Sequence, residues 1–258
     1  MTSKSLSFKR IPWVFFDLDD TIWNFRVNSD IALRKVYQNS PILRKFFNDP
    51  QQFIDIYHEH NSRLWLMYGN GEVSAKELKL ERWRRTLATC QFEVLTAVCE
   101  ELENNYLDIL VQCTEEVKSV KKILDEISKY ALIGVLSNGF LHTQYQKIKY
   151  SGLNRYITRL VVSDEIGINK PDKRLFDYAV DETGATPPFL MVGDNTHTDI
   201  IGAMNAGWFA IRINNSGKDD PLSLETLNKN GVDSKLLLAD VVSLEEALPI
   251  IRQFIINH

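Results

Sequence analysis

Three aspartates stand within four residues, directly after a short apolar run. Residues 11–16 form the apolar run, and Asp17, Asp19 and Asp20 follow it. Successive side chains of a strand point to opposite faces, so Asp17 and Asp19 leave the end of such a strand on the same side. Two neighbouring carboxylates repel each other, which is costly unless a cation or a reaction uses them. The pattern therefore indicates a divalent metal site and a nucleophilic aspartate.

Three further apolar segments also end in polar residues that could take part in chemistry. The first segment, 131–136, is followed by Ser137-Asn138-Gly139, and the second, 157–162, leads through a loop to Lys170-Pro171. The third segment, 189–192, is followed by Gly193-Asp194, with Asp199 shortly after it. Because ligands bind outside the carboxyl ends of parallel strands, we expect these groups to converge at one edge of a sheet. Each motif alone is common in turns or helix starts. Their ordered combination, one at each strand end, predicts a site.

Together these residue types suit phosphoryl transfer, which needs positioning and neutralisation of charge on the transferred group. Asp17 and Asp194 could hold Mg²⁺, which prefers hard oxygen ligands. The Ser137 hydroxyl and the backbone N–H groups after it could donate hydrogen bonds to a phosphoryl oxygen. Lys170 would bring a positive charge to the carboxylates and the phosphate, and Asp199 would orient Lys170. One aspartate would then attack as the nucleophile, and another would serve as general acid and base.

The elements that must position these residues change in type along the chain. Residues 22–113 are almost wholly of helical pattern, with Ser74 and Glu77 predicting a capping box. From about residue 115 helical and strand patterns alternate, which predicts a parallel sheet covered by helices on both faces. The expected strands are 11–16, 131–136, 157–162, 189–192 and 208–213, and helices are expected at 141–150, from Pro171 to about 182, at 198–205 and at 244–256. The sequence thus predicts an α/β, Rossmann-like three-layer core with an inserted all-helical domain.

Composition excludes several classes of protein. The chain has 258 residues and a formal net charge of −4, so it has no basic field for a nucleic acid polymer. No apolar run approaches a membrane span, and the polar segment 1–10 lacks the apolar stretch of a secretory signal. Cys90, Cys99 and Cys113 lack metal-site spacing and are expected to be reduced thiols. A cytoplasmic protein is expected.

The four motifs resemble those of the haloacid dehalogenase-like hydrolase superfamily. The resemblance implies that Asp17 forms an aspartyl-phosphate and that Asp19 is the general acid and base, which also offers its backbone carbonyl to Mg²⁺. It further implies that Ser137, Asn138 and Lys170 bind the phosphoryl group. Asp194 would be a metal ligand and Asp199 its outer-sphere partner. Residues 1–22 and 114–258 would form the core, and residues 23–113 the C1 cap domain of the superfamily.

More narrowly, the segments 15–25, 64–71 and 205–207 are similar to the pyrimidine 5′-nucleotidase branch of that superfamily. This similarity implies a Mg²⁺-dependent phosphomonoesterase that acts on a small phosphorylated metabolite, a nucleoside 5′-monophosphate. Two alternatives stay open: a sugar-phosphate or phosphoglycolate phosphatase, and a non-catalytic phosphate-binding regulator. Trp65, Tyr68 and Arg82 are the cap residues considered for contact with the leaving group.

Overall fold

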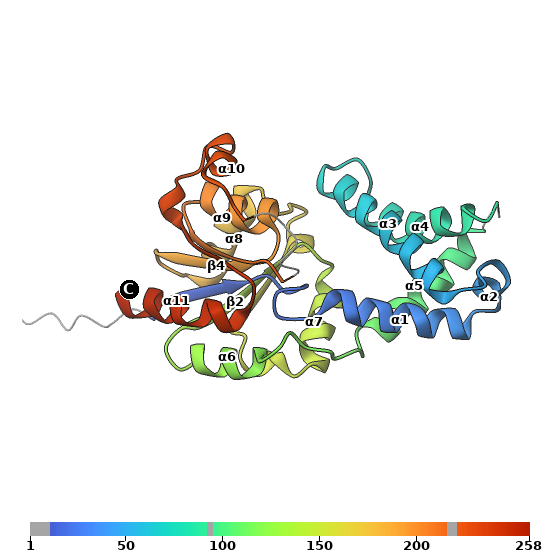
Figure 1. Cartoon of the computed structure of the whole chain (residues 1–258), viewed down its shortest axis with the longest axis horizontal. Helices are drawn as coiled ribbons and strands as arrows, with labels where there is room; N and C mark the ends of the chain where they lie inside the picture. Colours follow the sequence, from blue (N-terminus) through green and yellow to red (C-terminus); the bar gives the residue numbers. More distant parts are fainter. Residues whose placement is uncertain (1–10, 92–94, 216–220) are drawn as a thin grey trace, which may run out of the picture. The chain divides into compact units, whose positions relative to one another are not determined.

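The computed structural model describes residues 11–91, 95–215 and 221–258, so the polar segment 1–10 lies outside the described residues. The chain divides into two compact units (Figure 1). The first unit contains the described residues up to Trp23, with Glu116–Gln144 and Gly152–His258. The second unit contains Asn24–Glu115 and Tyr145–Ser151.

The first unit is built on a six-stranded parallel sheet in the order β3-β2-β1-β4-β5-β6. The strands are β1 (Trp13–Phe16), β2 (Leu132–Ser137), β3 (Arg159–Val162), β4 (Phe189–Gly193), β5 (Phe209–Ile213) and β6 (Leu237–Val241). All four residues of β1 are buried, as expected of a central strand covered on both faces. Strand order reverses at β1, which pairs with β2 on one side and β4 on the other. This reversal is where open α/β sheets bind ligands.

Helices cover both faces of this sheet (Figure 1). A core cluster that includes Trp13, Phe15, Phe176 and Trp208 fills the face under α8 and α9. Phe15 and Trp208 have ring centroids 4.8 Å apart, so aromatic packing anchors this side of β1. The helices of this unit are α6 (Val120–Ile127), the start of α7 (Leu141–Tyr150), α8 (Lys173–Thr183), α9 (Gly202–Asn205), α10 (Leu224–Lys229) and α11 (Leu244–Asn257). From Tyr145 on, α7 belongs to the second unit. The unit also contains the short 3₁₀ turns η1 (Leu153–Arg155), η2 (Ser163–Glu165) and η4 (Ser234–Leu236) and the π-helical turn η3 (Thr196–Ile201).

The second unit is helical, and its larger segment, Asn24–Glu115, follows β1 in the chain. Its helices are α1 (Phe25–Asn39), α2 (Pro41–Phe46), α3 (Pro50–Gly69), α4 (Ala75–Ala88) and α5 (Thr96–Leu110). The predicted capping box is present: the Ser74 side chain accepts from the Glu77 backbone, and the Glu77 carboxylate accepts from the Ser74 backbone. A group of buried aromatic rings forms the core of this unit, among them Tyr57 and Trp83 at 4.8 Å.

The predicted α/β fold with an inserted helical segment after β1 is confirmed, with two differences. First, residues 214–243 had no element assigned, yet they contain α10 and the edge strand β6. Second, the helix expected at 198–205 is divided into η3 and α9. The Asn195 side chain accepts from the backbone N–H groups of His197 and Thr198, and this cap starts the wider π turn before the position expected.

The cysteines and the lengths of the helices bear on two expectations from composition. All three cysteines are free thiols, and Cys99 and Cys113 are buried. Among the helices of the described ranges, none has both the length and the apolar character that a membrane crossing requires.

Candidate active site

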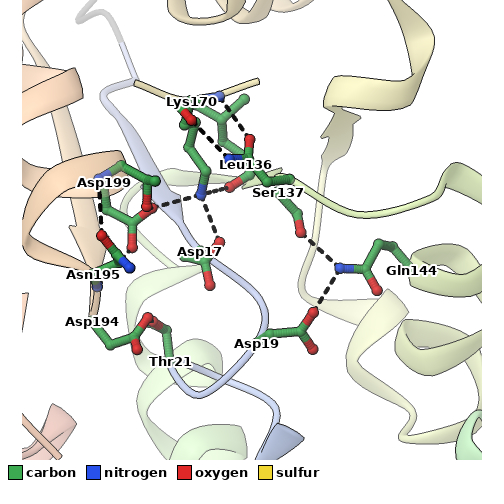
Figure 2. Close-up of polar contacts among 12 residues, drawn as sticks. Asp17, Asp19, Thr21, Leu136, Ser137, Gln144, Lys170, Asp194, Asn195 and Asp199 are labelled. Carbon is green, nitrogen blue, oxygen red and sulfur yellow. Dashed lines mark hydrogen bonds and ion pairs between the residues drawn. The ribbon is translucent and has the colours of Figure 1, made fainter. Parts of the chain in front are cut away.

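The predicted site residues of the first unit gather at the carboxyl ends of the central strands (Figure 2). Asp17 directly follows β1, Ser137 ends β2, and Asp194 directly follows β4. The backbone N–H of Asp17 donates to Val192 O at 2.9 Å, which extends the β1–β4 pairing to the edge where the carboxylates stand. The convergence expected of a parallel sheet is therefore present.

Lys170 stands at the centre of this group. Its Nζ lies 2.6 Å from Asp17 Oδ1, 2.7 Å from Asp199 Oδ1 and 2.6 Å from the carbonyl oxygen of Leu136 (Figure 2). An ammonium group has three protons and no acceptor, so these three contacts match its full donor capacity. Burial alone would lower the pKa of Lys170, but the Asp17 and Asp199 carboxylates raise it above its ordinary value. Lys170 therefore stays charged beside the carboxylates.

Asn138 holds the backbone of Lys170 from the neighbouring loop. Its Nδ2 donates to Lys170 O at 2.8 Å, and its Oδ1 accepts from the Lys170 backbone N–H at 2.7 Å. The predicted role of Asn138 was phosphoryl binding. Both side-chain groups bond the Lys170 backbone, so the group of Asn138 left to meet a phosphoryl oxygen would be its main-chain N–H. The side chain instead fixes the place from which Lys170 reaches the carboxylates.

Asp199 is buried and held from three directions. Its Oδ2 accepts from the backbone N–H of Asn195 at 3.0 Å, and its Oδ1 pairs with Lys170 and accepts from Thr198 Oγ1 at 3.2 Å. A Cβ at Gly193 would lie 2.4 Å from Asp199 Oδ2, so a residue with a side chain could not stand there without displacing the carboxylate. Both oxygens of Asp199 thus hold Lys170 and the loop after β4.

The aspartates form a cluster that could hold a metal ion. One carboxylate oxygen from each of Asp17, Asp194 and Asp199 lies within 4.8 Å of the others. Burial raises the pKa of Asp17 to about 7, with Lys170 opposing and Asp199 and Asp19 adding to the rise. Burial likewise raises the pKa of Asp194 to about 9, with Asp199 and Asp17 adding to it. A divalent cation would neutralise the negative charge of these neighbouring carboxylates. Carboxylate oxygens are also the hard ligands that Mg²⁺ prefers.

Thr21 and Gln144 belong to the site although the sequence analysis gave neither a role. Thr21 is buried, and its Oγ1 donates to Asp194 Oδ1 at 3.3 Å. Gln144 Nε2 donates to Asp19 Oδ2 at 2.9 Å and to Ser137 Oγ at 2.7 Å (Figure 2). Thr21 directly follows the three aspartates in the chain, so its position was a usable signal. No sequence pattern separated Gln144 from the other polar residues of its helix.

The three cap residues considered for leaving-group contact differ in their surroundings. Arg82 is buried in the second unit and makes a two-pronged ion pair with Glu103, so its side chain is a part of that unit's core. Trp65 and Tyr68 are half-buried, and their rings meet edge to face at 5.7 Å.

A family model and several relatives match this chain over most of its length. The model of the haloacid dehalogenase-like hydrolases matches residues 11–207. Pyrimidine 5′-nucleotidase YjjG of Escherichia coli (strain K12) is 29% identical over 214 residues, which are 81% of this chain and 88% of that protein. Human N-acylneuraminate-9-phosphatase is 27% identical over 224 residues, which are 82% of this chain and 86% of that protein.

A solved structure is similar to this chain over most of its length. The putative HAD-hydrolase YfnB of Bacillus subtilis, crystallised with bound magnesium, superimposes with a TM-score of 0.77 at 25% identity. The alignment covers 95% of this chain and 100% of YfnB.

Proposed function

This chain belongs to the haloacid dehalogenase-like hydrolase family and is a phosphatase of that family, and we propose that its substrates are pyrimidine nucleoside 5′-monophosphates. In this proposal Asp17 is the nucleophile, Asp19 is the general acid and base, and Mg²⁺ is the cofactor. The division into a core of residues 1–22 and 114–258 and a cap of residues 23–113 belongs to the same proposal.

The observation that carries the proposal is the buried cluster of Lys170 with Asp17 and Asp199. A buried ammonium between two carboxylates is costly for a fold and is weak evidence for added stability. It is useful in phosphoryl transfer, because it holds the Asp17 oxygen in place and offers positive charge to the transferred group. The contacts at 2.6 and 2.7 Å supply this arrangement without rearrangement of the side chains.

Asp17 and Asp194, with the backbone carbonyl of Asp19, are the groups proposed to hold Mg²⁺. Burial raises the pKa values of the two carboxyls, and the neighbouring carboxylates add to the rise; a bound cation would oppose both effects, so the donor set fits. Bound Mg²⁺ would neutralise the carboxylates and the phosphoryl oxygens that face them. The magnesium in the YfnB crystal structure supports the same metal here.

The residues of the chain then divide the reaction into two steps. In the first, an oxygen of Asp17 attacks phosphorus, the bond to the leaving oxygen breaks, and Asp19 gives that oxygen a proton. The product is an aspartyl-phosphate on Asp17 and a free alcohol. In the second, Asp19 takes a proton from water as the water oxygen attacks phosphorus, which releases inorganic phosphate and restores Asp17. Ser137, Lys170 and the Asn138 main-chain N–H are proposed to hold the phosphoryl oxygens in both steps.

The pyrimidine nucleotide preference is supported by YjjG, a pyrimidine 5′-nucleotidase that matches 81% of this chain. The similarity to N-acylneuraminate-9-phosphatase favours a second candidate, a sugar-phosphate phosphatase, because it covers a comparable share of the chain.

A substrate panel with Mg²⁺ tests the proposal. It includes pyrimidine and purine nucleoside 5′-monophosphates, sugar phosphates and phosphoglycolate, and Asp17→Asn is the matched inactive variant. We expect the highest kcat/KM with UMP, dUMP or dTMP and no turnover by Asp17→Asn. Higher kcat/KM for sugar phosphates would replace the nucleotide preference by the second candidate. Absence of turnover across the panel would favour a phosphate-binding regulator, and full activity of Asp17→Asn would refute the mechanism.

A further inference from the structure

Gln144 connects two residues of the site through one amide group. It lies in the first turn of α7 and is buried, with 1% of its surface exposed. Its Nε2 donates one proton to Asp19 Oδ2 at 2.9 Å and the other to Ser137 Oγ at 2.7 Å (Figure 2). Because a carboxylate oxygen accepts hydrogen bonds, the nitrogen of the amide, not its oxygen, must face Asp19.

The position of this amide is fixed by its surroundings. A Cβ at Gly139 would lie 2.4 Å from Gln144 Nε2 and 2.5 Å from Cδ, so the absence of a side chain there makes room for the amide. The start of α7 is also anchored, because the Leu141 backbone N–H donates to Asp164 Oδ2 at 3.1 Å. Packing on one side and the helix start on the other therefore hold Gln144 against Asp19 and Ser137.

We propose that Gln144 is a positioning residue that orients Asp19 and Ser137 for phosphoryl transfer. The inference rests on the proposed function, in which Asp19 is the acid and Ser137 binds the phosphoryl group. A carboxyl group held at Oδ2 keeps its plane, and with it the direction in which it delivers a proton. The Ser137 oxygen accepts from Gln144, and an amide nitrogen accepts nothing in return. The Ser137 proton is thereby directed to another acceptor, a phosphoryl oxygen of the substrate.

The two effects predict different responses to the leaving group. Loss of Asp19 orientation slows only substrates whose leaving oxygen needs a proton, whereas loss of Ser137 orientation slows all phosphate monoesters alike. The test compares kcat/KM, which reports formation of the aspartyl-phosphate, for the best alkyl phosphate of the panel and for 2,4-dinitrophenyl phosphate. General acid catalysis contributes about 10²–10⁴-fold, so we expect Gln144→Leu to lose at least about 10-fold more on the alkyl phosphate.

Two further variants separate positioning from a general loss of structure. Gly139→Ala keeps Gln144 but displaces its amide, so it should show the same selective loss on the alkyl phosphate. Lys149→Gln, at an exposed position of the same helix, is the control and should leave both values unchanged. If Gln144→Leu lowers kcat/KM equally on the two substrates, or does not lower it, the proposal that Gln144 orients Asp19 is overturned. Thermal melting checks that each variant is folded. If Gln144→Leu does not fold, Gln144→Glu is measured in its place.

Binding of inorganic phosphate tests the Ser137 part without turnover. Calorimetry with Mg²⁺ should show weaker phosphate binding for Gln144→Leu and for Ser137→Ala. The double variant should bind no more weakly than Ser137→Ala alone, because the amide acts through the hydroxyl. Additive losses would overturn this part. The wild-type protein and Asp17→Asn are measured alongside, so that failure of the phosphatase proposal, seen as an inactive wild type, is distinct from failure of the Gln144 inference.

Discussion

The buried ion pair of the helical unit predicts that a double substitution costs less than either single one. Glu103 accepts from Arg82 Nε at 2.9 Å, from Arg82 Nη2 at 2.6 Å and from Trp83 Nε1 at 2.8 Å. Arg82 Nη1 also donates to Asn61 Oδ1 at 3.1 Å. The two charged side chains are 5% and 6% exposed, so little water can replace a lost partner.

The expected free-energy changes follow from which charge is left buried. Glu103→Leu leaves the guanidinium without its carboxylate, and Arg82→Met leaves the carboxylate with only the Trp83 indole. Breaking a buried pair from one side costs about 3–5 kcal/mol, so each single variant should lose about 4 kcal/mol of unfolding free energy. In the double variant no charge is buried. The Trp83 indole and the Asn61 oxygen each lose a partner, and at about 1 kcal/mol for each the total loss is about 2 kcal/mol.

Urea unfolding followed by circular dichroism measures these losses, because urea does not screen charges as guanidinium chloride does. Peptide-level hydrogen exchange in α4 and α5 assigns the transition to the helical unit. The reasoning is refuted if the double variant loses the sum of the single losses, about 8 kcal/mol, or if both single variants lose less than about 1 kcal/mol.

Further predictions concern the Lys170 loop, the carboxylate cluster and a helix cap. Asn138→Ala removes both side-chain bonds to the Lys170 backbone, so kcat should fall and stability should drop by about 1–3 kcal/mol, as measured by steady-state kinetics and urea unfolding; unchanged values would contradict the clamp. In the metal-free protein the raised pKa values of Asp17 (about 7) and Asp194 (about 9) mean that the folded state binds protons more tightly than the unfolded state, so stability should decrease as pH rises from about 4 through 9. Mg²⁺ should therefore raise Tm more at pH 9 than at pH 6 in scanning calorimetry, and an equal rise at both pH values would count against the carboxylates as ligands. Ser74→Ala removes the N-cap of α4 and should cost about 1 kcal/mol in urea unfolding, with no measurable cost arguing that the cap is redundant.

Several parts of the site could be predicted because their signals are local in the chain. A short apolar run followed at once by Asp17 and Asp19 identifies both a strand and its functional end. The same holds for Ser137 at the end of β2 and for Asp194 directly after β4. The parallel arrangement of strands follows from their alternation with helices, and it alone brings these separate ends together. Edge strand β6 was not predicted, although residues 236–242 are apolar apart from Asp240; the five residues of the strand are only half-buried, as suits an edge position.

Contacts between distant side chains could not be predicted in this way. Asn138 is 32 residues from Lys170, and its sequence context allows a phosphate-binding side chain as readily as a backbone clamp. Gln144 is 125 residues from Asp19, and Arg82 is 21 residues from Glu103. Each of these contacts depends on how helices and loops pack in three dimensions, which a pattern of polar and apolar residues does not specify.

The sequence by itself therefore determined the fold class and the chemistry at the strand ends, because both depend on residue type and short-range periodicity. The tertiary structure decided how those groups are held: Asn138 clamps the Lys170 backbone, and Gln144 lies between Asp19 and Ser137. Buried polar groups must find partners, and in this molecule the partners come from strands and loops that meet only when the sheet is complete.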